Sequence, residues 1–310
     1  MIRNSGAFGH PAVKSPPPIL FIVFAALLWS TGGLFIKKSG LSTFEISFGR
    51  SLLAAITVAL LTRGEGYGFN WMTALTSLLY AALLILFVIA TKKTTSANAI
   101  FLQYTAPIYV LIFEPLIFRE KFRFLDAAVV AVCIGGMMLF FVGKLRADDV
   151  VGNLAALASG LCLAFYFLFL RHPHSQRINR ASSVIYGNLA VVVISAVALA
   201  VKPELRSQSP TEIGFRDLGI LLYLGIVQIG VAYSLFTLGI ARGVRSLEAG
   251  IVGYIEPVLN PIWVFLFVDE RPANWAIIGG SVIILAVLIH AILNALHKPS
   301  PGPAFIPTEH

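Results

Sequence analysis

Residues 96–124, SANAIFLQYTAPIYVLIFEPLIFREKFRF, and residues 246–274, SLEAGIVGYIEPVLNPIWVFLFVDERPAN, are two copies of one segment. A constant shift of 150 residues, without gaps, aligns identical residues, namely Ser96 with Ser246, Tyr104 with Tyr254, Pro107 with Pro257 and Glu120 with Glu270. Each copy is a long apolar run with a proline near its middle and a charged cluster at its end. The segment therefore divides the chain into two equivalent halves, each with an interrupted apolar helix.

The composition indicates a membrane protein. Of the 310 residues, 57% are hydrophobic and 12% are charged, whereas soluble domains have about 25% charged residues. A formal net charge of +8 could suggest a nucleic-acid partner, but nearly every Lys and Arg lies at the end of an apolar run. Basic residues in such places anchor helices at the membrane surface. We therefore expect contact with membrane lipid and no binding of nucleic acid.

Ten apolar stretches have about the 20 residues that a membrane-spanning helix needs. They cover residues 19–36, 44–62, 72–91, 97–118, 125–143, 152–170, 182–201, 216–238, 246–268 and 273–296. The midpoint at residues 144–153 leaves five stretches on each side. Two copies of a five-helix unit in one chain must enter the membrane from opposite faces. The sequence therefore predicts an all-α integral membrane protein with ten transmembrane helices, arranged as two inverted five-helix repeats.

The predicted organisation has five parts. They are a disordered cytoplasmic tail (1–18), a first repeat (19–143), a linker (144–151), a second repeat (152–296) and a second disordered cytoplasmic tail (297–310). With both termini in the cytoplasm, the inner face carries 12 Lys or Arg residues and the outer face 10. This small margin does not decide the orientation. The clusters after the fourth and ninth stretches have opposite net charge, as clusters on opposite faces should.

In each interrupted helix the proline shares one face with polar residues. In the fourth stretch this face consists of Gln103, Pro107, Val110 and Glu114, spaced 4, 3 and 4, and in the ninth of Gly253, Glu256, Pro257 and Asn260, spaced 3, 1 and 3. Under the inverted symmetry both faces line the central axis. Interrupted helices in corresponding places of two halves are the best sequence indication of a transporter's binding site, so we expect a small-molecule cavity between them.

Pro107 and Pro257 are the predicted hinges. A proline removes the backbone donor for the carbonyl four residues earlier, so the two prolines free the carbonyls of Gln103 and Gly253. A freed carbonyl in a water-lined cavity can bind a cation or a substrate ammonium group. Alternatively, each proline only bends its helix and shapes the packing. The sequence leaves both interpretations open.

Two ionisable residues inside the apolar stretches are candidates for substrate binding. Glu256 lies near the middle of the ninth stretch, where burial disfavours its charged form. It is a candidate proton carrier or counter-charge for a substrate amine, or else a protonated structural side chain. Arg50 could hold a substrate carboxylate, pair with Glu45 or another acidic group, or extend to the membrane surface.

Aromatic and polar residues complete the predicted cavity, whose apolar walls and few polar groups suit amphiphilic solutes. The substrate-binding set is Trp29, Ser30, Arg50, Tyr80, Gln103, Tyr104, Pro107, Tyr166, Gln228, Tyr233, Tyr254, Glu256 and Asn260.

Other function classes are less consistent with the sequence. An integral-membrane enzyme would need clustered catalytic groups, but only His290 of the six histidines lies in an apolar stretch, and no HExxH motif occurs. No GxxxxGK[ST] segment for binding ATP occurs either. A channel or a sensor without active transport is a further alternative, although a channel is more readily built as a symmetric oligomer. We therefore expect no enzymatic activity, no catalytic residue, no metal or other cofactor, and function as a monomer.

Residues 95–141 and 233–289 resemble the two EamA-type halves of the drug/metabolite transporter superfamily. The shared features are a helix start rich in Ala, Ser and Gly, a mid-helix proline, an acidic end at Glu120 and Glu270, Trp29 in AALLWSTGG and Arg50 in SFGRSLLAA. The chain departs from the pattern before the acidic end, where Arg119 and Asp269 replace the usual glycine. The resemblance covers residues 18–296. It implies a ten-helix secondary transporter of a bacterial inner membrane that exports amino acids or similar metabolites by alternating access.

Overall fold

The structure is a computed structural model. It describes residues 16–94, 96–119, 121–140, 150–179, 181–206, 214–268 and 274–296. The acidic positions Glu120 and Glu270, the C-terminal tail, and most of the predicted N-terminal tail and linker lie outside the described residues.

The described part of the chain is helical throughout and contains no strand. Its elements are α1 (Pro18–Trp29), α2 (Gly32–Lys38), α3 (Thr43–Leu61), η1 (Arg63–Glu65), α4 (Trp71–Lys93), α5 (Ser96–Gln103), α6 (Ala106–Phe118), α7 (Phe124–Phe140), α8 (Val150–Leu170), α9 (Pro173–Gln176), α10 (Ser182–Val201), η2 (Pro203–Leu205), α11 (Phe215–Leu222), the π-helix η4 (Tyr223–Val231), α12 (Ala232–Ala241), α13 (Ser246–Gly253), α14 (Ile255–Val268) and α15 (Asn274–Leu296).

Seven helical segments among the described residues are long and apolar enough to cross a membrane. They are Pro18–Lys38, Thr43–Leu61, Trp71–Lys93, Ala99–Phe118, Val150–Leu170, Ser182–Val201 and Phe215–Ala241. They coincide with seven of the ten predicted stretches. Shorter apolar helices, Phe124–Leu139 and Ile277–His290, lie in the fifth and tenth stretches, and α13 and α14 lie in the ninth. The all-helical membrane fold is thus confirmed, whereas the count of ten spans and their inverted arrangement stay predictions.

Capping groups define where several of these helices begin. At the start of α3, Glu45 N–H donates to Ser42 Oγ at 3.3 Å and Ser42 N–H donates to Glu45 Oε2 at 2.8 Å, which is a capping box. Asn70 caps α4 by accepting the Thr73 N–H at 2.8 Å. The capping box also bears on the predicted pairing of Arg50 with Glu45. It engages the Glu45 carboxylate at the start of α3, away from Arg50.

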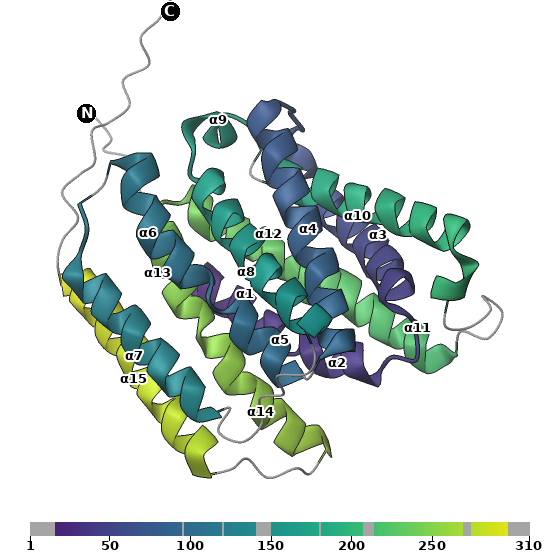
Figure 1. Cartoon of the computed structure of the whole chain (residues 1–310). Helices are drawn as coiled ribbons and strands as arrows, with labels where there is room; N and C mark the ends of the chain where they lie inside the picture. The colour runs from purple at the N-terminus through teal and green to yellow at the C-terminus, as the bar shows by residue number, and fades with distance from the viewer. Residues whose placement is uncertain are drawn as a thin grey trace, which may run out of the picture.

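The helices form one bundle in which elements from the two halves alternate (Figure 1). The helices α7 and α15 lie side by side at one edge, and α3 and α10 pack together at the opposite edge. Between them, α4 packs against α8, and α1 packs against α12. The halves are therefore interleaved rather than separate, and their contacts form the core.

The two helices with duplicated sequence are each interrupted by a short turn, at which Thr105 and Tyr254 keep right-handed helical dihedral angles. The fourth stretch is interrupted between α5 and α6, at Tyr104 and Thr105, and the ninth is interrupted at Tyr254, between α13 and α14. The two helices meet near their breaks, because a Cβ at Gly250 would lie 3.3 Å from Pro107 Cγ. A turn that interrupts helical hydrogen bonding at membrane depth is tolerated inside the protein or beside a cavity.

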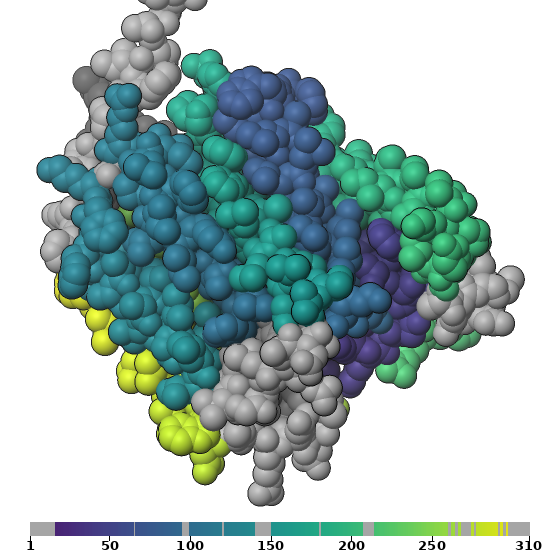
Figure 2. Space-filling view, viewed as in Figure 1, coloured from purple at the N-terminus to yellow at the C-terminus, as the bar shows by residue number. Residues whose placement is uncertain are grey.

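The outer surface is rich in large apolar side chains. Exposed examples on different helices are Phe24, Leu60, Leu116, Phe124 and Val193. In the space-filling view, the side chains of α4, α6, α7 and α8 form a continuous surface on one face of the bundle (Figure 2). An apolar surface over packed helices is what a lipid-facing protein requires.

Candidate functional site

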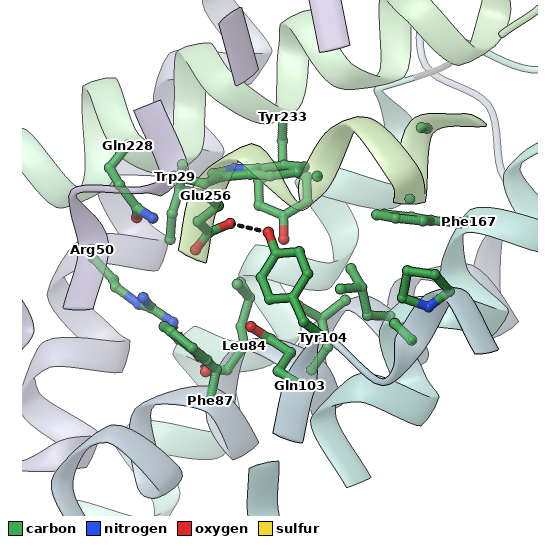
Figure 3. A pocket seen from close by; sticks show the side chains of 18 residues that line it. Trp29, Arg50, Leu84, Phe87, Gln103, Tyr104, Phe167, Gln228, Tyr233 and Glu256 are labelled. Carbon is green, nitrogen blue, oxygen red and sulfur yellow. Dashed lines mark hydrogen bonds between the residues drawn. The ribbon is translucent and has the colours of Figure 1, made fainter. Parts of the chain in front are cut away.

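A narrow cavity lies at the centre of the bundle, where the broken helices meet (Figure 3). Its volume is about 50 Å³, which is room for a few water molecules and not for a metabolite. All 18 side chains that line this central cavity are buried. They are Trp29, Arg50, Leu83, Leu84, Phe87, Gln103, Tyr104, Ala106, Pro107, Leu163, Phe167, Gln228, Ile229, Tyr233, Ala249, Gly250, Gly253 and Glu256.

Arg50 provides a positive charge in the central cavity. Its side chain is 1% exposed, and Nη2 donates to the carbonyl of Leu84 at 3.0 Å. Its Nε has no hydrogen-bond partner, and no carboxylate of the described residues forms an ion pair with it. A buried guanidinium with spare donors is costly, so this arrangement suits an anionic group that enters from outside the chain.

A close approach of two helices sets the position of Arg50. Gly225 in η4 faces α3, and a Cβ there would lie 2.7 Å from the Arg50 carbonyl oxygen and 2.5 Å from Leu53 Cβ. Only a glycine lets the backbones come so near. The π-helix brings Gln228 to the same region of the cavity wall, and π-helical turns are frequent at functional sites.

Glu256 provides an acidic group in the same cavity. It is 7% exposed and accepts a hydrogen bond at 2.5 Å from the hydroxyl of Tyr104 (Figure 3). Tyr104 lies at the break between α5 and α6, and Glu256 follows the break between α13 and α14. The carboxyl group of the second half is therefore held by a tyrosine of the first half.

The cavity also contains polar groups without a partner among the described residues. The Oε1 of Gln228 and the Nε1 of Trp29 are buried and make no hydrogen bond. Gln103, in contrast, is engaged, because its Nε2 donates to Ser159 Oγ at 2.8 Å. The unpartnered donor and acceptor lie beside Arg50 and Glu256 in the lining, where a bound solute could satisfy them.

The carbonyl that Pro107 frees does not open freely into the cavity. A Cβ at Gly160 of α8 would lie 2.6 Å from the Gln103 carbonyl oxygen, so this oxygen packs against α8. Of the two interpretations of the proline, the geometry at Pro107 favours helix shaping over ligand binding.

Tyr80 and Tyr166 lie beside the central cavity rather than in its lining. With four other side chains they form an aromatic layer, defined as Trp29, Tyr80, Tyr166, Phe167, Tyr233 and Phe236. The ring centroids of Tyr80 and Tyr233 are 4.7 Å apart, and those of Tyr80 and Tyr166 are 5.3 Å apart. Asn188 Nδ2 donates to the Tyr80 hydroxyl at 3.1 Å.

Three further predicted residues, Ser30, Tyr254 and Pro257, lie outside the lining. Ser30 donates to the carbonyl of Leu27 at 2.6 Å and accepts from Trp263 Nε1 at 2.7 Å, so it joins α1 to α14. Tyr254 is buried behind Tyr104, with 5.8 Å between the ring centroids. The predicted hinge Pro257 is buried in the first turn of α14. The side chain of Asn260 lies outside the described residues.

Sequence reasoning missed the apolar and small part of the lining. These residues are Leu83, Leu84, Phe87, Ala106, Leu163, Phe167, Ile229, Ala249 and Gly250, whereas Gly253 lies on the face of the ninth stretch that is predicted to line the axis. Helical spacing from Tyr80, by three, four and seven residues, could have identified the three on α4. The others carry no signal that separates them from ordinary packing residues. Among the described residues, no group of three His, Cys, Asp or Glu side chains is placed to hold a metal ion.

Comparison with protein families gives a match over both halves. The model of the EamA-like transporter family matches residues 16–142 and residues 150–292.

Individual relatives have low identity but nearly full coverage. A pseudopaline exporter, CntI, of Pseudomonas aeruginosa strain UCBPP-PA14 is 27% identical over 87% of this chain and 94% of its own length. The uncharacterized transporter YwfM of Bacillus subtilis is also 27% identical, over 87% and 92%. Mouse solute carrier family 35 member G1 is 22% identical over 91% and 81%. A solved crystal structure, 20% identical, superposes with a TM-score of 0.76 over 89% of this chain and 97% of that one, which shows the same fold.

Proposed function

The chain belongs to the EamA-like transporter family, and from this premise we propose that it is a secondary transporter that exports amphiphilic amino acids or similar small metabolites by alternating access. Its membrane nature follows from the apolar helices and from relatives named as transporters. We place it in a bacterial inner membrane, with both termini in the cytoplasm and function as a monomer, because its symmetry is internal.

The observation that carries the proposal is the pair of ionisable groups in one apolar cavity. The unpaired guanidinium of Arg50 suits a carboxylate, which accepts two parallel hydrogen bonds from arginine. Glu256 can face a substrate amine or exchange a proton. Leu84, Phe87 and Phe167 supply apolar wall for a hydrocarbon or aromatic side chain. A zwitterion with an apolar part meets all three requirements.

Helix directions support the inverted repeat. A second pocket is lined by the start of α4 and by the end of α12, which are the third helix of the first half and the corresponding helix of the second. This one pair of corresponding helices runs in opposite directions, as the inverted repeat requires. The packing pairs agree, because α4 with α8 corresponds to α12 with α1, and α4 with α10 corresponds to η4 with α3. Such a pair of halves can exchange two states around a fixed central site.

The closed cavity supports alternating access. A cavity of about 50 Å³ with buried walls fits an intermediate that is shut to both faces, and substrate entry then requires the helices to part. Energy comes from the substrate gradient or from proton exchange through Glu256, and the second source predicts a dependence of transport on pH.

Transport by the purified protein in liposomes tests the proposal. We expect efflux of a radiolabelled apolar amino acid, identified from a panel. Arg50→Gln should lower the rate about 10- to 100-fold, because a hydrogen bond to a charged group contributes about 1.5–3 kcal/mol. Arg63→Gln is the matched control, since Arg63 lies in η1 just after α3, outside the cavity. An absence of flux for every solute, or equal rates for the two variants, would contradict the proposal.

A further inference from the structure

A polar pocket lies at one end of the bundle, separate from the central cavity. Its volume is about 320 Å³. It lies at the starts of α4 and α10, at the ends of α8 and α12, and beside α9. The residues of this polar vestibule are Thr73, Thr76, Leu170, Ser175, Gln176, Ile178, Asn179, Ser183, Thr237, Ile240 and Ala241.

The polar vestibule has the properties of a water-filled space. Hydroxyl and amide side chains make up most of its lining, and none of the lining residues is charged. Most of these groups donate to nearby backbone carbonyls, as Thr76 does to Met72 at 2.9 Å and Ser175 to Phe169 at 2.6 Å. The volume of the space is far more than one water molecule needs, and a polar wall lets water enter it.

The aromatic layer lies between the polar vestibule and the central cavity. Three helices show this arrangement. Along each of them a residue that lines the vestibule, a ring of the aromatic layer and a residue that lines the cavity follow one another about one helical turn apart. The series are Thr76, Tyr80 and Leu84 in α4, Leu170, Tyr166 and Leu163 in α8, and Thr237, Tyr233 and Ile229 along α12 and η4. Eight residues of helix span about 12 Å, so the barrier between the two spaces is one layer of rings.

The contacts within the layer join the two halves of the chain. Trp29 and Tyr80 belong to the first half, and Tyr166, Tyr233 and Phe236 belong to the second. The centroids of Trp29 and Tyr233 are 4.6 Å apart, and those of Trp29 and Phe236 are 5.2 Å apart. Ring contacts of this kind stabilise a packed arrangement beyond the area that they bury. A relative tilt of the halves would separate the rings without breaking an ion pair within the layer.

We propose that the polar vestibule and the central cavity are consecutive parts of one path, and that the aromatic layer is the gate that closes the cavity on the vestibule side. The proposal rests on the proposed transport function, because only a transporter would use this path for a substrate. The position of the barrier is independent of any substrate, and it can be measured in protein that has not been shown to transport.

Labelling of single cysteines tests the gate. The natural cysteines, Cys133 and Cys162, are free thiols and are first replaced by alanine. Ser175→Cys then reports on the vestibule, because Ser175 is partly exposed and lines it, and Leu84→Cys reports on the cavity. A membrane-impermeant maleimide is applied to one face of vesicles at a time. In the otherwise unaltered protein, Ser175→Cys should react rapidly from one face, and Leu84→Cys should react slowly from that face.

Removal of one ring should open the barrier. With Tyr80→Ala, labelling of Leu84→Cys should approach the rate of Ser175→Cys, from the same face only. Tyr166→Ala provides a second variant in case the first does not fold, as judged by size-exclusion chromatography. Tyr186→Ala is the matched control, because Tyr186 lies on α10 and packs against Phe69, outside the layer.

Three outcomes would overturn the gate. They are an unreactive Ser175→Cys, a Leu84→Cys that already reacts as fast as Ser175→Cys, and folded Tyr80→Ala and Tyr166→Ala variants that leave Leu84→Cys protected. If the expected labelling pattern holds while liposomes transport no solute, the proposed function fails and the gate does not.

Discussion

Glu256 and Arg50 share one cavity but differ in how the chain satisfies them. Glu256 receives one strong donor, the Tyr104 hydroxyl, at 2.5 Å. Arg50 has only a backbone carbonyl and keeps a buried Nε without a partner among the described residues. A buried carboxyl group with one donor can exist charged or protonated, whereas a guanidinium stays charged. The two residues are therefore suited to different tasks, with Arg50 as a fixed anchor for an anion and Glu256 as the group that changes charge.

The first prediction concerns Glu256→Gln. The amide keeps the shape of the side chain but cannot exchange a proton, so a proton-coupled transporter should lose the pH dependence of its rate. We expect the rate at its pH optimum to fall about 10- to 100-fold as a charged hydrogen-bonding group is lost. Flux in liposomes measured across a pH series provides the test.

Glu248→Gln is the control for this prediction. Glu248 lies in the first turn of α13, eight residues before Glu256, and does not line the central cavity. An unaltered pH profile in Glu256→Gln would show that this carboxyl group is structural.

At the scale of the helix, the breaks beside Pro107 and Pro257 are where the protein can bend. Pro107 stands at the start of α6, a position where proline costs little because its missing N–H would have no helical partner. The carbonyl of Gln103 packs on Gly160. The break is thus supported by packing from α8 and does not depend on a ligand.

The second prediction tests Pro107 as a hinge. Pro107→Ala should slow transport while leaving the melting temperature close to that of the unaltered protein, since this proline is at a helix start. Pro115→Ala is the control, because Pro115 lies inside α6 and its replacement should stabilise the helix by up to about 3 kcal/mol. Transport at the original rate by Pro107→Ala would show that motion at this break is not limiting.

The third prediction concerns the contact between α5 and α8. A Cβ at Gly160 would approach the Gln103 carbonyl oxygen to 2.6 Å, and backbone cannot move away cheaply. We expect Gly160→Ala to lower the free energy of unfolding by about 1–3 kcal/mol, the usual cost of overpacking. Gly135→Ala on α7 should be neutral or stabilising, because nothing lies within 4 Å of the added atom and alanine favours helix. Thermal unfolding in detergent compares them, and equal melting temperatures would refute the contact.

The sequence predicts an element well where the membrane imposes a clear pattern of apolar residues on it, and poorly where no such pattern exists. Apolar runs between charged ends place α3, α8 and α10 within two residues of their observed bounds, because lipid demands an uninterrupted apolar length. The same signal identifies Arg50 and Glu256 as exceptions. It does not identify η4, since π-helical geometry has no composition of its own. The apolar pattern also predicts Tyr80 and Tyr166 in the cavity, although they belong to the adjacent aromatic layer. An apolar span indicates how deep a residue lies in the membrane, but it does not indicate which way the helix is rotated about its axis.

At the scale of the molecule, buried charges join the two halves near the polar vestibule. Glu114 accepts from Arg171 Nη1 at 2.6 Å and from Arg245 Nη2 at 3.4 Å. Arg245 also lies 3.2 Å from Asp126, whose other oxygen lies 2.9 Å from His290 Nε2. Glu114 and Asp126 belong to the first half and the three basic residues to the second. Because Arg171 follows the end of α8, which also lines the polar vestibule, this charged network and the aromatic layer restrain the same end.

A second set of contacts joins the halves at the other end. Asp217 Oδ1 accepts from Ser39 Oγ at 2.9 Å and from Gly40 N–H at 3.0 Å. Asp217 lies in the first turn of α11, and the continuous helical segment Phe215–Ala241 has 27 residues, or about 40 Å of helix. Since the end of that segment lines the vestibule, Asp217 lies at the opposite end of the bundle. An alternating-access protein needs such a restraint at each end, and each must break in turn.

The fourth prediction is that removing one restraint favours opening at that end only. Glu114→Gln leaves two arginines, 21% and 25% exposed, without their shared carboxylate, at a cost of about 1–3 kcal/mol to the closed state, between the values for exposed and buried pairs. The population open at the vestibule end should rise about tenfold, and so should labelling of Leu84→Cys from that face. Asp217→Asn should raise labelling from the opposite face instead. Equal effects of both variants on the two faces would indicate general loosening, and would contradict a mechanism in which the two ends open alternately.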